Sequence, residues 1–165
     1  MGCTISNESK QEEVRRSKLM NITLKDTHQF SFEGLTTEAK VVDIYDGDTL
    51  RIAFYYKDEI VQTSCRCLEY DAPEMKLPKL SKNATSKEKE DRETLKNFAV
   101  KAKERLSGML KNELVTINFF KNDLYGRPLV KIFVDGKYIN QEMINEGYGK
   151  PYDGGHKNVW TVEDC

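Results

Sequence analysis

Two runs of alternating apolar residues stand on either side of a tight turn, and this pattern limits the folds open to the chain. The first run places Val42 and Ile44 on one face, and the second, 49–55, alternates with a clean period of two. That period is typical of a strand with one buried face. Asp46-Gly47, between the runs, is a strong signal for a hairpin turn. The sequence therefore predicts a β-hairpin here.

Three further runs predict strands, and one long segment predicts a helix. The strand runs cover roughly 60–68, 115–119 and 130–134. From about 87 to 110, apolar residues recur at helical spacing, and Thr85 with Glu88 matches a capping box. A short helix is expected near Asn140. The order predicts an α+β fold, mainly β: a five-stranded Greek-key barrel of the OB type with one long and one short helix.

Length and charge indicate one small domain with a polar extension. The chain has 165 residues, 32% of them charged, and a net charge of −1, so no global basic field attracts nucleic acid. Residues 1–27 form a polar, mixed-charge N-terminal tail without sustained periodicity. Residues 28–165 are expected to form the folded domain.

Cysteine and histidine usage excludes several kinds of chemistry. The four cysteines, at positions 3, 65, 67 and 165, indicate a reducing compartment, and we expect Cys65 and Cys67 to face opposite ways along their strand. No Cys/His cluster has zinc spacing, and two histidines make histidine-based catalysis improbable. No apolar run is long enough to span a bilayer, and there is no secretory h-region.

Acids and arginines recur at the ends of the predicted strands. They occur in Asp46-Gly47-Asp48-Thr49, at Arg66, in Asp71-Ala72-Pro73-Glu74 and in Tyr125-Gly126-Arg127. Carboxylates hold a hard cation and act on a water, and arginines hold a phosphate. Taken singly, each motif has an ordinary structural explanation, such as a turn with exposed acids or a salt bridge between Arg66 and Glu69 or another acid.

Together, the order and spacing of these motifs resemble those of the staphylococcal (thermonuclease-type) nuclease family. Arg66 stands five residues before Asp71 and eight before Glu74, as in the family's pattern, and the resemblance covers about 38–152. It implies a calcium-dependent nuclease that hydrolyses DNA, RNA or both. By the same resemblance, Asp48 and Asp71 are ligands of Ca²⁺, and Ala72, where the family often has Thr, adds its backbone carbonyl.

The resemblance also implies roles for the other motif residues. Glu74 would activate or position the attacking water, and Arg66 and Arg127 would grip the scissile phosphate. Tyr125 would contact the substrate. Tyr152 aligns loosely with a second substrate-contacting tyrosine.

Two other interpretations compete with the nuclease. One is a non-catalytic, nucleic-acid-binding OB-type module, against which the presence of all the acids and arginines argues. The other is a membrane-tethered interaction protein. No protein partner is inferred from the sequence.

The first six residues carry a separate signal. Met1-Gly2-Cys3-Thr4-Ile5-Ser6 matches the pattern for N-myristoylation at Gly2, and Cys3 could take a palmitoyl chain. Acylation would place the protein on the cytoplasmic side of a membrane in a eukaryotic cell, or in a virus of one. Without it, we expect a cytoplasmic protein.

Overall fold

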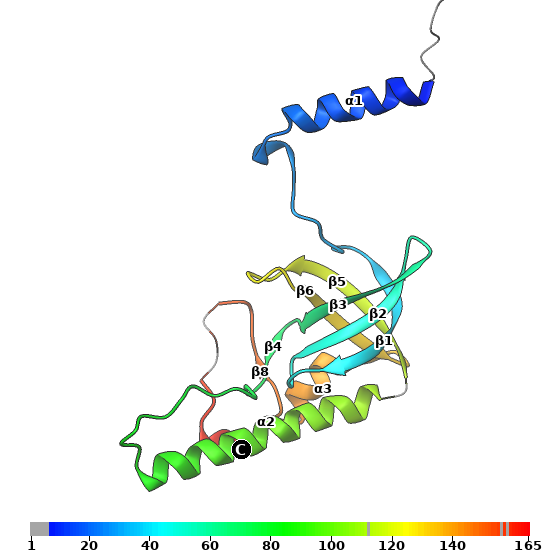
Figure 1. Ribbon diagram of the computed structural model, residues 1–165. Helices are drawn as coiled ribbons and strands as arrows, with labels where there is room; N and C mark the ends of the chain where they lie inside the picture. Colours follow the sequence, from blue (N-terminus) through cyan, green and yellow to red (C-terminus); the bar gives the residue numbers. More distant parts are fainter. Residues whose placement is uncertain (1–6, 112, 156, 158) are drawn as a thin grey trace, which may run out of the picture. The chain divides into compact units, whose positions relative to one another are not determined.

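The chain divides into two compact units, Met1–Phe30 and Ser31–Cys165. The computed structural model (Figure 1) describes residues 7–111, 113–155, 157 and 159–165. All the acids and arginines of the predicted site lie in the second unit, so the fold of that unit positions the chemistry.

The described part of the first unit is mainly helical, and its described side chains are not buried. It contains α1 (Asn7–Asn21) and the short 3-10 helix η1 (Leu24–Asp26), and every described side chain from 8 to 30 is exposed. The segment has no apolar periodicity because a helix without a buried face needs no apolar stripe. Glu8 in the first turn of α1 and Lys18 in its last turn suit the helix dipole. No helix in the described ranges combines the length and the apolar character that crossing a membrane requires.

Five strands close into a barrel in the second unit (Figure 1). They are β1 (Thr36–Ile44), β2 (Thr49–Tyr56), β3 (Glu59–Cys67), β5 (Leu114–Asn122) and β6 (Pro128–Val134). Their order is β3-β2-β1-β5-β6, and a parallel pairing of β3 with β6 closes the barrel. The short strand β7 (Lys137–Tyr138) extends the sheet beyond β6. The predicted five-stranded OB-type barrel is confirmed.

Two helices of the second unit match the predicted long and short helices. The long helix α2 (Ser86–Leu110) begins at the predicted capping box, in which Thr85 Oγ1 accepts the Glu88 N–H at 3.2 Å and Glu88 Oε2 accepts the Thr85 N–H at 2.7 Å. Its buried stripe consists of Phe98, Ala99, Ala102, Leu106 and Leu110. The short helix α3 (Ile139–Asn145) follows β7. The alternating inner faces of the strands and the α2 stripe form one core.

Two details of strand facing were predicted wrongly. A bulge between Val41 and Asp43 shifts the register of β1, so Val42 is exposed although Ile44 is buried. Cys65 and Cys67 are free thiols that are both buried, so they do not face opposite ways. Residues two apart in a strand share a face, so the spacing of the two cysteines already predicted this.

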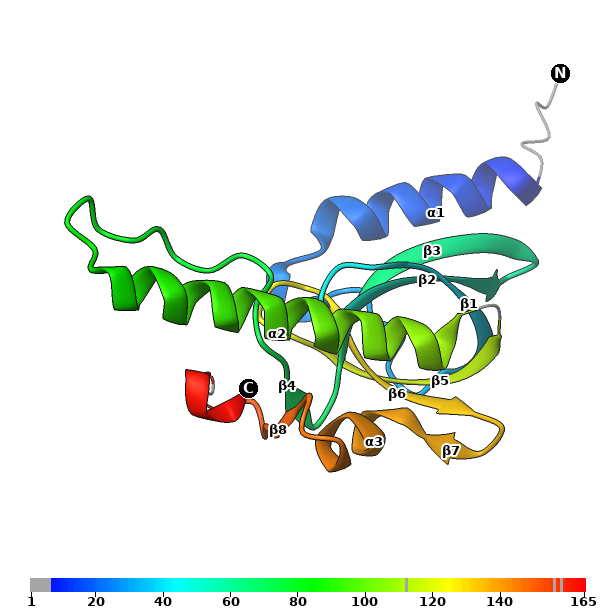
Figure 2. The same cartoon turned by 90° about the horizontal axis from the view of Figure 1, so that it is seen from below.

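The chain after α3 returns to the strand that carries the second acidic motif. The short strand β4 (Tyr70–Asp71) pairs with β8 (Lys150–Pro151). Gly149 permits this approach, because a Cβ there would lie 2.6 Å from the Tyr70 ring. The final 3-10 helix η2 (Val162–Asp164) contacts α2, as Figure 2 shows. The C-terminal segment therefore runs beside the predicted site.

Candidate active site

The turn between β1 and β2 carries two of the acids, and both are buried. Asp46 and Asp48 lie within the turn on either side of Gly47. The turn packs closely: a Cβ on Gly47 would lie 2.8 Å from the Cβ of Ala72, so only glycine fits. The Tyr70 hydroxyl donates a hydrogen bond of 2.7 Å to the Gly47 carbonyl. This contact holds the acidic turn against β4.

Arg66 brings the two predicted metal-binding carboxylates to one place. It pairs with Thr49 across β2 and β3, and its side chain is 13% exposed. Its Nη2 lies 2.8 Å from Asp48 Oδ2 and 2.6 Å from Asp71 Oδ1. Buried charges in proteins are normally paired in this way. The sequence leaves the acidic partner of Arg66 open between Glu69 and another acid. In the structure its partners are Asp48 and Asp71, and Glu69 instead pairs with a lysine.

The segment 71–74, which begins with the last residue of β4, supplies one buried acid and one accessible acid. Asp71 is fully buried, whereas the Glu74 side chain is 41% exposed and pairs with Lys157. Between these two acids, the Ala72 N–H donates a long hydrogen bond of 3.4 Å to Asp48 Oδ2. The backbone at position 72 thus lies against the acidic turn, and Glu74 is the acid that water reaches most easily.

Burial and close charge pairs shift the pKa values of Asp48 and Arg66. Burial raises the pKa of Asp48 to about 6, although the attraction of Arg66 opposes that shift. Burial alone would lower the pKa of the Arg66 guanidinium, but Asp48 and Asp71 raise it above its ordinary value. At neutral pH, Asp48 is ionised, but its burial makes this ionisation unfavourable in free energy. A further cation at this place would reduce that cost.

Arg127 approaches the same centre from the turn between β5 and β6. Its Nη2 pairs with Asp123 Oδ2 at 2.7 Å, and its side chain is 28% exposed. Its Nη1 donates to Thr49 Oγ1 at 3.4 Å, and the Thr49 hydroxyl in turn donates to Asp48 Oδ1 at 2.9 Å. The exposed ring of Tyr125 lies 5.5 Å from the Arg127 guanidinium. Arg127 and Tyr125 therefore stand at the accessible edge of the site.

Residues beyond β8 also reach the centre. The Tyr152 ring lies 5.5 Å from the Arg66 guanidinium, which places this loosely aligned tyrosine at the site. Trp160 Nε1 donates to Asp71 Oδ2 at 3.2 Å, and Lys157 Nζ lies 3.7 Å from Asp71 Oδ1. Sequence reasoning missed Lys157 and Trp160 as site residues. The one signal in the sequence is that Trp160 is the single tryptophan of the chain.

The donor set at the centre suits a hard cation. Asp48 and Asp71 converge within hydrogen-bond distance of one nitrogen, and the backbone of Ala72 lies beside Asp48. Among the residues that the structure describes, no group of three or more His, Cys, Asp and Glu side chains is arranged to hold a metal. Carboxylate and carbonyl oxygens are the ligands that Ca²⁺ takes, together with water. The residues present therefore fit Ca²⁺ in their chemistry.

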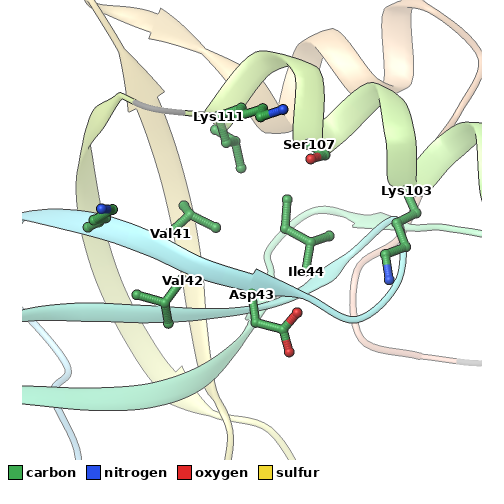
Figure 3. Close-up of a pocket in the computed structure, with 9 residues that line it drawn as sticks. Val41, Val42, Asp43, Ile44, Lys103, Ser107 and Lys111 are labelled. Carbon is green, nitrogen blue, oxygen red and sulfur yellow. The ribbon is translucent and has the colours of Figure 1, made fainter.

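A basic groove of about 290 Å³ lies between β1 and α2 (Figure 3). Its lining includes Lys40, Lys103 and Lys111, together with Asp43. None of the three lysines forms an ion pair with another residue in the described ranges. In a chain whose net charge is −1, this groove concentrates positive charge, which suits a polyanion.

Comparison with known proteins agrees with this geometry. The family model of staphylococcal nuclease homologues matches residues 64–161, more than half of the chain. The chain belongs to this family. The match includes Arg66, the 71–74 segment, Arg127 and Trp160, whereas the acidic turn at 46–49 precedes it. A domain of this family is a nuclease or a nucleic-acid-binding module.

A bacterial relative extends the comparison without assigning an activity. An uncharacterized protein of Bacillus anthracis is 29% identical over 132 residues, which is 78% of this chain and 54% of the relative. The chain thus spans about half the length of that relative. Gly2 and Cys3 lie outside the described residues, so their acylation stays a prediction from sequence.

Proposed function

We propose that this domain is a calcium-dependent nuclease that hydrolyses phosphodiester bonds of DNA, RNA or both. The observation that carries the proposal is the convergence of Asp48 and Asp71, from two separate segments, on the part-buried guanidinium of Arg66. Carboxylates for a hard cation beside an arginine for phosphate are what hydrolysis of an anionic ester requires. Membership of the nuclease family supports the same activity.

Asp48 and Asp71 would hold the cation, with the carbonyl of Ala72 as a third oxygen. Bound there, Ca²⁺ supplies positive charge that offsets the charge building up on the phosphate. Because the two carboxylates fill only part of the six to eight positions typical of Ca²⁺, positions remain for water and for substrate oxygens.

Glu74 is the candidate general base. It is the most exposed of the three acids of the site, so a water molecule can approach it. Glu74 takes a proton from the water whose oxygen attacks phosphorus. The bond from phosphorus to the leaving oxygen then breaks, and that oxygen takes a proton from solvent water. General-base catalysis of this kind contributes roughly 10²–10⁴-fold.

Arg66 and Arg127 would bind the phosphate. Both ion pairs of Arg66 use Nη2, and a guanidinium carries five N–H donors, so further donors remain for a phosphate. Arg127 and Tyr125 stand at the accessible edge, and Tyr152 lies against Arg66. Beyond the centre, the lysines of the basic groove would attract the rest of the nucleic-acid backbone.

A plasmid-nicking assay tests the proposal. Supercoiled DNA and a labelled RNA are incubated with the full chain in Ca²⁺ and, separately, in chelator. Cleavage that requires Ca²⁺ is the expected result. Binding of either polymer without cleavage in any condition would instead establish the non-catalytic binding module.

Matched variants locate the activity in the site. Asp71→Asn keeps the shape of the side chain but removes a charge, and it should abolish most cleavage and weaken Ca²⁺ binding. Asp135→Asn is the control: Asp135 lies in the turn before β7 with φ of 49°, a conformation that Asn also adopts. Equal cleavage by the two variants would refute the assigned centre.

We also propose that Gly2 is myristoylated and Cys3 palmitoylated, so that the domain works at the cytoplasmic face of a membrane. The motif at 1–6 is the support for this proposal. One myristoyl chain binds membranes only marginally, with an association constant on the order of 10⁴ M⁻¹, so a second chain is required. Expressed in a eukaryotic cell, the chain should fractionate with membranes and Gly2→Ala should not. An unmodified N-terminus would contradict the proposal.

A further inference from the structure

The C-terminal segment, defined here as residues 157 and 159–164, contacts the acidic side of the site. Lys157 Nζ pairs with Glu74 Oε1 and lies 3.7 Å from Asp71 Oδ1. Trp160 Nε1 donates to the other oxygen of Asp71, at 3.2 Å. The segment therefore touches both the expected metal ligand and the expected base.

Several contacts anchor this segment to the rest of the domain. Lys150 of β8 pairs with Asp164 at 2.8 Å and donates to the Val159 carbonyl at 3.1 Å. The same ammonium lies 4.7 Å from the centre of the Trp160 ring. The Trp160 ring also packs on Phe98 of α2, with ring centroids 5.8 Å apart. Figure 2 shows this end of the chain beside β8 and α2. The segment is thus anchored independently of the Lys157 ammonium.

Lys157 supplies positive charge where the proposed cation would act. Asp71 faces two cationic side chains, Arg66 and Lys157, and Glu74 faces Lys157. An ammonium paired with Glu74 Oε1 occupies one of the two oxygens that could accept a proton from water. A cation coordinated by Asp71 would repel that ammonium.

We propose that Lys157 is an internal counter-ion that must be displaced when the divalent cation binds. In the metal-free protein it holds Asp71 and Glu74 in a resting, autoinhibited arrangement. Cation binding releases Lys157 and leaves Glu74 free to act on water. This inference rests on the proposed function, because it requires that the cation binds at Asp71.

Calcium binding to the full chain tests the displacement directly. Ca²⁺ is titrated into wild type, Lys157→Gln and Lys157→Arg, with calorimetry and the fluorescence of Trp160 as readouts. Trp160 is the single tryptophan, and it hydrogen-bonds to Asp71, so its emission reports on this carboxylate. Lys137→Gln is the matched control, since it removes a lysine that pairs with Glu142 at 2.7 Å on another part of the domain.

Lys157→Gln should bind Ca²⁺ up to about fivefold more tightly than wild type at low salt, the range expected for a half-exposed ion pair. Lys157→Arg and Lys137→Gln should stay near wild type. The advantage of Lys157→Gln should shrink as salt screens the pair. The Lys157 side chain is 43% exposed, so the variant is expected to fold, and circular dichroism checks this.

Two results would overturn the inference, and they are distinguishable. Unchanged or weaker Ca²⁺ binding by folded Lys157→Gln, while wild type binds, refutes the displacement but leaves the nuclease proposal intact. Absence of Ca²⁺ binding in wild type and in Lys157→Gln refutes the cation itself, and the displacement with it.

Discussion

The two arginines of the site are held in place by different means. Arg66 lies on a barrel strand, is 13% exposed, and pairs with Asp48 and Asp71 from two other segments. Arg127 lies on a turn, is 28% exposed, and pairs with Asp123, four residues before it in the chain. One guanidinium is therefore fixed by tertiary structure and the other mainly by its own turn.

The sequence assigns the same phosphate-binding role to both arginines, but their contacts give them different importance for the stability of the fold. Arg66 serves the fold as well as the proposed chemistry, because without it two buried carboxylates have lost their shared partner. Arg127 serves the fold little, because its acidic partner is local and its own side chain is 28% exposed. The comparison predicts that stability and activity respond differently at the two positions.

The largest expected effect is on stability. Arg66→Ala should lower the free energy of unfolding by about 3–5 kcal/mol, because it leaves buried charge uncompensated. Arg127→Ala should lower it by no more than about 1 kcal/mol. Urea unfolding in chelator measures both values. Similar losses of unfolding free energy at the two positions would contradict the difference between the two arginines.

The largest effect on activity without loss of stability is expected at Arg127, the more accessible of the two arginines. Arg127→Lys should reduce cleavage well over tenfold, because lysine lacks the planar fork that grips a phosphate and each charge-assisted hydrogen bond is worth roughly 1.5–3 kcal/mol. Its unfolding midpoint should stay near that of wild type. Arg51→Lys, at an exposed position of β2, is the control and should cleave normally. Full activity of Arg127→Lys would remove Arg127 from the phosphate site.

A change in pH should alter the part of the stability that depends on the buried carboxylate of Asp48. Burial raises the pKa of Asp48 from its ordinary value of 3.8 to about 6, so the folded state binds an extra proton between these values. The stability that this proton contributes is complete below about pH 4 and is lost as pH rises through about 6.

Wild type and Asp48→Asn are compared in chelator at two pH values. The difference between their unfolding free energies, wild type minus variant, should therefore be larger at pH 4 than at pH 7. Arg127→Ala should keep the same pH dependence as wild type, since its contacts do not bury Asp48. Urea unfolding at the two pH values measures these differences. A wild-type minus Asp48→Asn difference that does not change with pH would contradict the burial of Asp48.

The smallest effect is expected at Asp123. Its Oδ1 accepts the N–H groups of Tyr125 and Arg127, both at 2.9 Å, and Asn can keep an acceptor there. Asp123→Asn should change stability by less than about 1 kcal/mol. It should also steepen the salt dependence of DNA binding by up to about one unit of slope, since Arg127 is released to a phosphate. A loss of several kcal/mol would mean that this turn is anchored as deeply as Arg66.

Much of the fold could be predicted from the sequence because its signals are local. The alternation in 49–55 requires only that one face of a strand be buried, and the capping box of Thr85 and Glu88 lies within one turn of α2. The side of the strand on which Cys65 and Cys67 lie also follows from their spacing, and the prediction that they face opposite ways is wrong. The exposure of Val42 could not be predicted, because a bulge depends on the pairing of β1 with β2.

The site was determined partly by sequence and partly by tertiary structure. The order of Asp48, Arg66, Asp71, Glu74 and Arg127 along the chain was enough to suggest their chemistry. Only the paired register of β2 and β3 and the packing of β4 on the acidic turn bring the first three to one point.

Tertiary structure alone brought Lys157 and Trp160 to Asp71. Neither residue stands in a local pattern that indicates a site, and the pairing of β4 with β8 carries their segment there. Periodicity and spacing report on neighbours along the chain, whereas contacts between distant segments depend on how the closed barrel fixes its strand ends. The sequence by itself therefore determined the barrel and the family, and the tertiary structure decided which charges meet.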